Sequence, residues 1–179
     1  MIVCALDVAT TTGLAITKGD AVLHWEAFRP KGKTSAEIHS GFRKWLMGML
    51  RAWSAPNVEE GIGIVVIEQP IPNSNIKSNM ATIRRLYGLI EAAESVCFDL
   101  NVPSDEAHII SWRTGVYGKG TKPPKGTSDP SAWWKQQALQ RCAMLKIPVK
   151  SKDAAEAICI AHWYAAKMRM QMISRLTRS

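Results

Sequence analysis

The 179-residue chain lacks the features that mark membrane-spanning, secreted and zinc-binding proteins. It has no stretch of roughly 20 apolar residues that could cross a bilayer. It also has no basic N-terminal region followed by a cleavable apolar segment. Its four cysteines and four histidines are scattered, without the paired spacing of a zinc site or of a disulfide framework. We therefore expect a cytoplasmic protein with reduced, mostly buried thiols and no contact with a membrane.

Acidic residues are nearly absent from one segment of the chain. Between Trp112 and Lys152 there are nine lysines and arginines, and Asp129 is the only acid. The rest of the chain carries equal numbers of acidic and basic residues, so this segment holds the whole net charge of +8. A localised basic patch is typical of proteins that bind a polyanion, above all nucleic acid.

The hydrophobic pattern predicts an α/β protein with one domain over residues 1–179. Continuous apolar runs predict strands covered on both faces, and apolar residues at helical intervals predict amphipathic helices. The order of these elements predicts a central five-stranded mixed sheet flanked by helices on both faces. The strands are expected at 1–6, 14–17, 21–28, 62–67 and 107–111, and the helices at 38–53, 80–100, 131–146 and 151–163.

Two further segments are predicted from composition. Residues 114–130 are rich in Gly, Lys, Pro, Thr and Ser, which predicts a basic, mobile loop. Residues 167–179 form a basic C-terminal tail.

Two of the apolar strands end in an acidic residue. Asp7 follows MIVCAL, and Glu68 follows IGIVVI. If a helical crossover joins these strands as parallel neighbours, both acids lie at the same edge of the sheet. Either acid alone could simply be a solvated strand end.

A second pair of acids lies in the helix predicted at 151–163. Ser151 is a candidate N-cap, and Asp153 and Glu156 are three residues apart, so both carboxylates emerge on one face. Taken alone, the pair could be a solvated first turn. Together with Asp7 and Glu68, it predicts a cluster of oxygen ligands that suits Mg²⁺ or Mn²⁺ better than zinc.

These acids and their surroundings resemble the motifs of the RuvC-type Holliday junction resolvases, which belong to the ribonuclease H-like superfamily. The resemblance lies in Asp7 within ALDVATTTGLAI, Glu68 within VVIEQP, and Asp153 with Glu156 in KDAAEAICIAHW. Leu86-Tyr87-Gly88, Trp112-Arg113, Tyr117-Gly118-Lys119-Gly120 and Lys135-Gln136 resemble further segments of the family. The resemblance extends over nearly the whole chain.

The resemblance implies a homodimeric endonuclease that nicks two strands of a four-way DNA junction symmetrically and uses no nucleotide cofactor. It implies two divalent ions, Mg²⁺ or Mn²⁺, held by Asp7, Glu68, Asp153 and Glu156, with Lys135 steadying the phosphate under attack. It also implies DNA contacts, for which the candidates are Arg113, Lys119, Lys122, Lys125, Ile71 and Trp133.

The chain departs from the family at several positions. Glu156 stands where bacterial members usually carry Asp, and Ile71 stands where they often use an aromatic wedge. Residues 121–131 correspond to an insertion. Such divergence is typical of phage-borne relatives.

Three other functions are compatible with parts of the pattern. A less selective nuclease for flaps or other branched DNA would need the same acids. A non-catalytic junction-binding protein would keep the fold and the basic segment. The Asp7-Val-Ala-Thr-Thr-Thr-Gly segment also resembles the first phosphate loop of actin-like ATPases, but those proteins close two such domains around a nucleotide.

Overall fold

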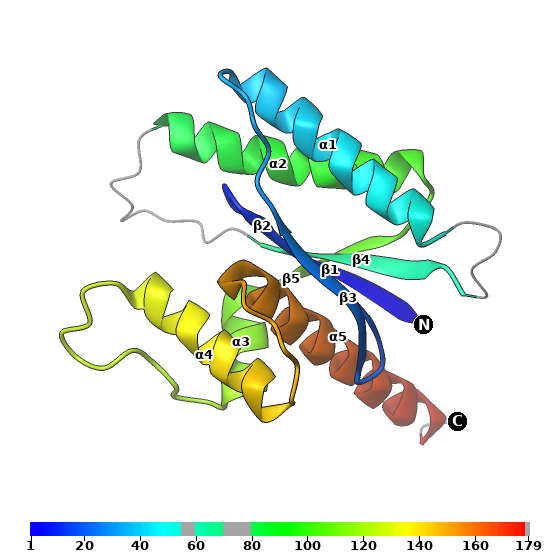
Figure 1. Cartoon of the computed structure of the whole chain (residues 1–179). Coiled ribbons are helices and arrows are strands. Elements are labelled where there is room, and N and C mark those ends of the chain that lie inside the picture. Colours follow the sequence, from blue (N-terminus) through cyan, green and yellow to red (C-terminus); the bar gives the residue numbers. More distant parts are fainter. Residues whose placement is uncertain (55–59, 70–79, 178–179) are drawn as a thin grey trace.

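The computed structural model describes residues 1–54, 60–69 and 80–177. Within them, five strands and five helices alternate in an α/β arrangement (Figure 1). No described helix is long and apolar enough to span a membrane. The strands are β1 (Ile2–Asp7), β2 (Thr12–Lys18), β3 (Ala21–Phe28), β4 (Ile62–Glu68) and β5 (Ser104–Ala107). The helices are α1 (Ser35–Ala52), α2 (Met80–Asp99), α3 (Ile109–Tyr117), α4 (Pro130–Met144) and α5 (Lys152–Leu176).

The strands form one mixed sheet in the order β3-β2-β1-β4-β5. The hairpin of β2 and β3 and the pair of β1 and β2 are antiparallel, whereas β4 runs parallel to both β1 and β5. Helices cover both faces, with α1 and α2 on one and α3, α4 and α5 on the other (Figure 1). The predicted mixed sheet with helices on both faces is therefore confirmed.

Large side chains fill the space between the sheet and the α1/α2 layer. Phe42, Leu46 and Leu50 of α1 are completely buried there, against Leu6 and Leu14 of the sheet. A capping box begins α1, because the Thr34 side chain accepts from the Glu37 amide and the Glu37 side chain accepts from the Thr34 amide. The cap fixes the residue at which α1 begins, and the apolar side of the helix then faces the sheet.

The opposite face is built differently, because α5 presents alanines to the sheet. Ala154, Ala155, Ala157 and Ala161 are all fully buried. A helix with such small side chains can lie close to the strands that it covers. The first turns of α5 are thus held near the central strands.

Two predicted boundaries are wrong. The fifth strand is not 107–111 but Ser104–Ala107, and residues from Ile109 onward form α3. The short apolar run after Ala107 is equally compatible with a buried helix, and periodicity cannot distinguish the two over so few residues. The predicted loop 114–130 is correspondingly shorter, because residues 114–117 belong to α3 and α4 begins at Pro130.

Candidate metal-dependent active site

Asp7 and Glu68 lie side by side at the carboxyl ends of two parallel strands. Leu6 of β1 is paired with Ile67 of β4, so the next residue of each strand is the acid. Asp7 is only 5% exposed, and its Oδ2 atom is buried with no hydrogen-bond donor among the described residues. The charge of Glu68 acts directly on Asp7, as expected for neighbouring carboxyl groups.

The first turns of α5 bring the second pair of acids to this edge. Ser151 caps the helix, and its hydroxyl accepts from the Ala154 amide. Glu156 is 3% exposed, although it is an acid in the middle of a buried alanine stripe. Asp7, Glu68, Asp153 and Glu156 are called the acid cluster below.

Gly13 allows α5 to approach this closely. It is the register partner of Asp7 in the β1/β2 pair. A Cβ atom at Gly13 would lie 2.0 Å from the carbonyl oxygen of Asp153, closer than any real side chain can pack. The main chain of α5 therefore rests directly on the strand beside Asp7. Gly13 is not among the site residues predicted from the sequence, although a glycine inside a strand is a recognised sign of close backbone approach.

Burial and mutual repulsion raise the pKa values of three of these carboxyl groups. The pKa of Asp7 is raised well above its ordinary value by burial and by the charge of Glu68. Burial and the charge of Glu156 raise the pKa of Glu68. Burial and the charge of Asp7 raise the pKa of Glu156 to about 7. Carboxylates held together in this way need a cation to remain ionised at neutral pH.

Two cationic side chains already contact the cluster. The Lys135 ammonium forms an ion pair with Asp153 and lies 4.0 Å from Oε2 of Glu156. Arg113 donates from Nη2 to Oε1 of Glu156 at 3.2 Å. Burial opposes the charge on Lys135, but the hydrogen bond to Asp153 and the charge of Asp7 outweigh it and raise the pKa of the ammonium group. Lys135 therefore stays protonated.

Trp112 fixes the orientation of Glu68. Its indole is completely buried, and Nε1 donates to Oε1 of Glu68 at 2.7 Å. The guanidinium of the adjacent Arg113 lies over the rings of Trp112 and Trp134, at 5.2 and 4.7 Å from their centroids. No local pattern in the sequence shows that this indole N–H meets a carboxylate 44 residues away.

The donor set of the cluster fits a divalent cation. All four side chains offer carboxylate oxygens, which Mg²⁺ and Mn²⁺ prefer. When all four are ionised, the carboxylates carry two more charges than Lys135 and Arg113 compensate, and the buried Oδ2 of Asp7 has no donor among the described residues. In the described part of the chain, however, no three acids, histidines or cysteines are already arranged as a closed ligand set. Asp153 and Glu156 turn toward Lys135 and Arg113 instead.

The other predicted DNA contacts lie outside the cluster. Lys119, Lys122 and Lys125 are exposed in the segment between α3 and α4, which projects as a wide arc from the helical layer (Figure 1). Trp133 is partly buried and packs edge-on against Trp134, with 4.8 Å between ring centroids. Ile71 lies outside the described residues.

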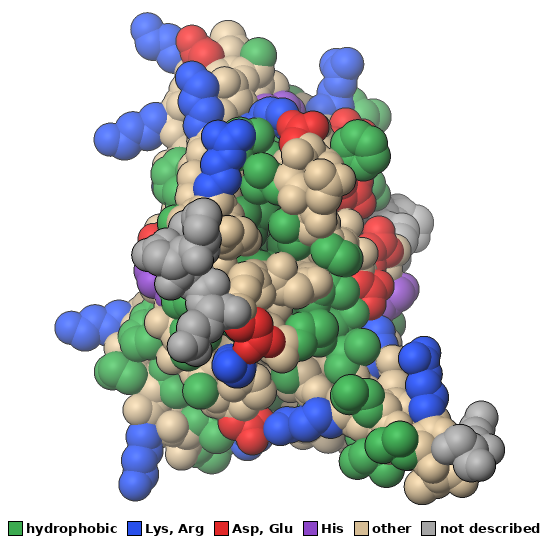
Figure 2. Space-filling model, turned by 90° about the vertical axis from the view of Figure 1, so that its right-hand side faces the viewer, with side chains coloured by type: hydrophobic (Ala, Val, Ile, Leu, Met, Phe, Trp, Pro, Cys, Tyr) green, Lys and Arg blue, Asp and Glu red, His purple; other side chains and the backbone are tan. Residues whose placement is uncertain are grey.

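The predicted basic C-terminal tail, residues 167–179, is helical up to Leu176. Figure 2 shows hydrophobic side chains gathered on the surface near this end of the chain, and lysines and arginines projecting over the helices on both sides of the sheet. The exposed apolar residues of this helix are Met170, Met172, Ile173 and Leu176.

Comparisons with known proteins support the fold. No family model matches the sequence, and no curated protein matches it either. Among solved structures, the chain is similar to RuvC of Thermus thermophilus in complex with a Holliday junction substrate, with a TM-score of 0.70 and 16% identity over 95% of this chain and 96% of that one. Another structure of T. thermophilus RuvC gives a TM-score of 0.68 and 17% identity over 96% and 97% of the two chains.

A eukaryotic structure is also similar. The yeast mitochondrial Holliday junction resolvase Ydc2 matches with a TM-score of 0.53 and 11% identity, over 91% of this chain and 77% of that one. The chain therefore has the RuvC-like resolvase fold, a ribonuclease H-like α/β fold.

Proposed function

We propose that this protein is a divalent-metal-dependent endonuclease that resolves four-way DNA junctions. The observation that carries the proposal is the acid cluster, in which residues from β1, β4 and α5 converge at one sheet edge with the pKa values of Asp7, Glu68 and Glu156 raised by burial and mutual repulsion. The likeness to two resolvase folds adds support.

The four acids would hold the cation. When bound, Mg²⁺ or Mn²⁺ would supply Lewis acidity and lower the pKa of a coordinated water. Trp112 keeps Glu68 in place through its N–H donor. Asp7 offers an oxygen that no donor of the described chain satisfies. These two residues would form the rigid part of the ligand set, because both lie at the ends of buried strands.

Lys135 and Arg113 would contact the DNA phosphate. Both are partly exposed cations that now contact Asp153 or Glu156. When a divalent ion neutralises those acids, the two side chains are free to donate to phosphate oxygens, for which Arg offers two parallel donors. The stacking of Arg113 between Trp112 and Trp134 limits how far its guanidinium can move.

The basic segment between α3 and α4 would bind the DNA backbone. Lys119, Lys122 and Lys125 are exposed there, next to the helices that carry Arg113 and Lys135. Phosphate contacts of this kind release counterions, so binding should weaken steeply as salt rises. We also infer that two copies of the chain act together, since a two-fold symmetric junction suits a two-fold symmetric enzyme.

The test compares a labelled four-way junction with a linear duplex of the same sequence, each with and without Mg²⁺. We expect paired nicks in the junction that require the metal. Asp7→Asn should lower cleavage by roughly 10³-fold, because a lost metal ligand removes several kcal/mol of transition-state stabilisation. Junction binding should survive, since the substitution removes a negative charge.

The matched control is Asp99→Asn, which makes the same chemical change on the opposite face, where Asp99 pairs with Arg43. It should leave cleavage unchanged. Full activity of Asp7→Asn would refute the active-site assignment. Equal cutting of the linear duplex would favour a less selective nuclease.

One observation favours a second candidate function, a junction-binding protein without catalysis. Lys135 and Arg113 contact Asp153 and Glu156, and the described residues form no closed ligand set. The same experiment separates the two candidates, because a pure binding protein would bind the junction tightly and leave it intact at every Mg²⁺ concentration.

A further inference from the structure

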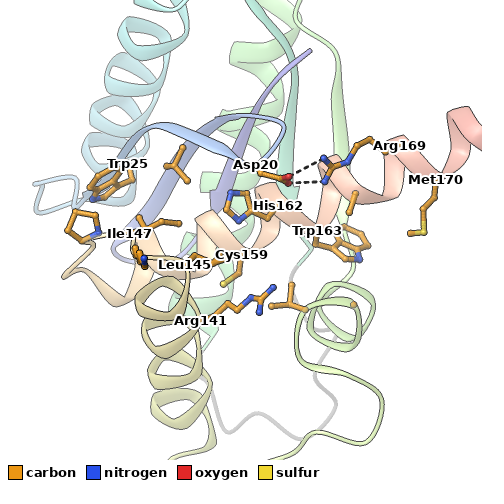
Figure 3. A pocket seen from close by; sticks show the side chains of 16 residues that line it. Asp20, Trp25, Arg141, Leu145, Ile147, Cys159, His162, Trp163, Arg169 and Met170 are labelled. Atoms are coloured by element: carbon orange, nitrogen blue, oxygen red, sulfur yellow. Dashed lines mark hydrogen bonds and ion pairs between the residues drawn. The ribbon is translucent and has the colours of Figure 1, made fainter.

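A cavity of about 750 Å³ lies beside the second half of α5. Its walls come from the turn between β2 and β3, from α3, from the end of α4 with the link to α5, and from Cys159–Met170 of α5 (Figure 3). None of its lining residues belongs to the acid cluster, Lys135 or Arg113. Its volume is within the range of small-molecule sites in proteins.

The walls of the cavity are largely apolar and include two indole rings. Trp25 of β3 and Trp163 of α5 lie toward opposite ends of the cavity (Figure 3). Gly115 of α3 allows the Trp163 ring to lie where it does, because a Cβ atom at that position would be 2.4 Å from Cδ1 of the indole. Ile147 and Met170 add aliphatic surface. Such walls favour a flat, apolar ligand.

Arg141 provides an unpaired positive charge in this apolar setting. Its side chain is partly buried, and within the described residues it has neither an ion-pair nor a hydrogen-bond partner. The carboxylate of Asp20, which also lines the cavity, is already occupied by two donors of Arg169, at 2.9 and 3.3 Å. A guanidinium that has no anionic partner in the described chain and lies on a largely apolar wall can pair with an anionic group of a ligand.

His162 provides a second polar group in the cavity wall, an imidazole in place of a guanidinium. Its Nε2 atom is buried without a hydrogen-bond partner among the described residues. Burial lowers the pKa of His162 and outweighs the charge of Asp20, which raises it, so burial favours the neutral ring. A neutral imidazole has one acceptor nitrogen, and Nε2 accepts a hydrogen bond when the proton is on Nδ1.

We propose that this cavity binds a small aromatic acid, with its ring against the indole-lined walls, its anionic group on the Arg141 guanidinium, and a hydroxyl or amino donor facing Nε2 of His162. The occupant would bridge α4, α5 and the β2–β3 hairpin. This proposal does not depend on the nuclease activity, since the cavity and the acid cluster share no residue.

The experiment measures binding of two probes to the purified full chain by isothermal titration calorimetry. The probes are 2-naphthoate and the uncharged 2-naphthalenemethanol, which differ in the anionic group and share the ring. We expect one naphthoate per chain, bound at least tenfold more tightly than the alcohol, because a hydrogen bond to a charged group contributes more than a neutral one.

Variants test whether Arg141 provides this preference. Arg141→Met should lower naphthoate affinity at least tenfold and leave that of the alcohol within twofold, whereas Arg141→Lys should retain most of the preference for the acid. The matched control is Arg51→Met, which removes an exposed arginine at the end of α1 and should change neither affinity. Circular dichroism confirms that each variant is folded before it is titrated.

A second substitution tests the location. Ala166 lines the cavity, and Ala166→Trp should fill it and abolish binding of both probes. Three results would each overturn the proposal: no naphthoate binding up to its solubility limit, equal affinity for acid and alcohol, or unchanged binding by folded Ala166→Trp protein.

Discussion

The two faces of the sheet differ in the size of the side chains that attach the helices. On the α1/α2 face, Phe42, Leu46 and Leu50 separate the helix from the strands. On the α5 face, alanines and Gly13 bring helix and strand backbones into contact. Large side chains bury more apolar area per residue and so contribute more stability. Small ones place functional groups near the sheet. Large side chains therefore hold α1 at a distance from the sheet on one face, whereas small ones bring the acids of α5 close to it on the other.

The largest expected effect tests the face of α1 and α2. Phe42→Ala should lower the free energy of unfolding by about 3–5 kcal/mol, because it leaves a cavity in a fully buried core. Cleavage per folded molecule should not change, since Phe42 lies on the face opposite the acid cluster. Urea denaturation measures the stability, and a junction-cleavage assay below the unfolding transition measures the activity.

The control for Phe42→Ala is Phe98→Ala. Phe98 is 84% exposed on α2, so its truncation should change stability by less than about 0.5 kcal/mol. Comparable losses from both variants, or a cleavage defect in folded Phe42→Ala protein, would break the division between the two faces.

The next effect concerns the unfolding free energy that is lost when an ionised acid is buried on the α5 face. Burial and the charge of Asp7 raise the pKa of Glu156 from 4.5 to about 7, so the folded protein binds its proton more tightly than the unfolded chain does. Without metal, this contribution to stability is complete below pH 4.5 and disappears as the pH rises through 7. Glu156→Gln should therefore be more stable than the wild type at pH 8 by roughly 2–3 kcal/mol.

The measurement for Glu156 is urea denaturation of both proteins in a chelator across this pH range. The difference in unfolding free energy between the variant and the wild type should widen from pH 5 to pH 8. A constant difference would mean that Glu156 does not titrate as described, and a difference of the opposite sign would mean that its contacts with Arg113 and Lys135 dominate.

A pair of glycine substitutions compares the close contacts on the two faces. Gly13→Ala should cost about 1–3 kcal/mol and reduce cleavage at least tenfold, because the new Cβ meets the main chain of Asp153 and displaces α5. In Gly88→Ala on α2, the new Cβ would lie 2.1 Å from Cε1 of His39, but the histidine side chain can move aside. The cost in stability of moving His39 should be offset by the roughly 1 kcal/mol gain in helix propensity. Thermal unfolding and the cleavage assay test both variants, and a smaller defect in Gly13→Ala than in Gly88→Ala would contradict the backbone contact.

The smallest effect distinguishes two tryptophans that both donate to a glutamate. Trp112 donates to Glu68 on the α5 face, and Trp45 donates to Glu26 on the α1 face. Replacing either by Phe should cost about 1 kcal/mol of stability, the net value of one hydrogen bond. Only Trp112→Phe should lower cleavage, by about tenfold, because Glu68 loses its orientation. Equal activity of the two variants would show that Trp112 has a structural role alone.

The sequence predicted the main strands and the acids at their ends because those features are local. Continuous apolar runs ending in Asp7 and Glu68 predict buried strands, and the Thr34 capping box predicts the start of α1. The parallel pairing of β1 and β4 follows from connection rules and is confirmed.

The missed features depend on tertiary contacts. β5 has the polar sequence SDEA, so its pairing with β4 rather than its own pattern makes it a strand. α3 was missed because its N-cap His108 forms no side-chain cap. The contact of Gly13 with Asp153 and that of Trp112 with Glu68 join distant parts of the chain, and no single segment encodes them.

The cap at Ser151 has a consequence for how the chain tolerates insertions. Each residue turns an α-helix by about 100°, so one inserted residue between Ser151 and Asp153 would rotate both acids of α5 away from the sheet relative to the cap. Beyond Met170 the described part of the helix is exposed, and changes of length there leave the phase of the first turns unaltered. The spacing from Ser151 to Glu156 is therefore under strict constraint, whereas the length of the C-terminal end is free to vary.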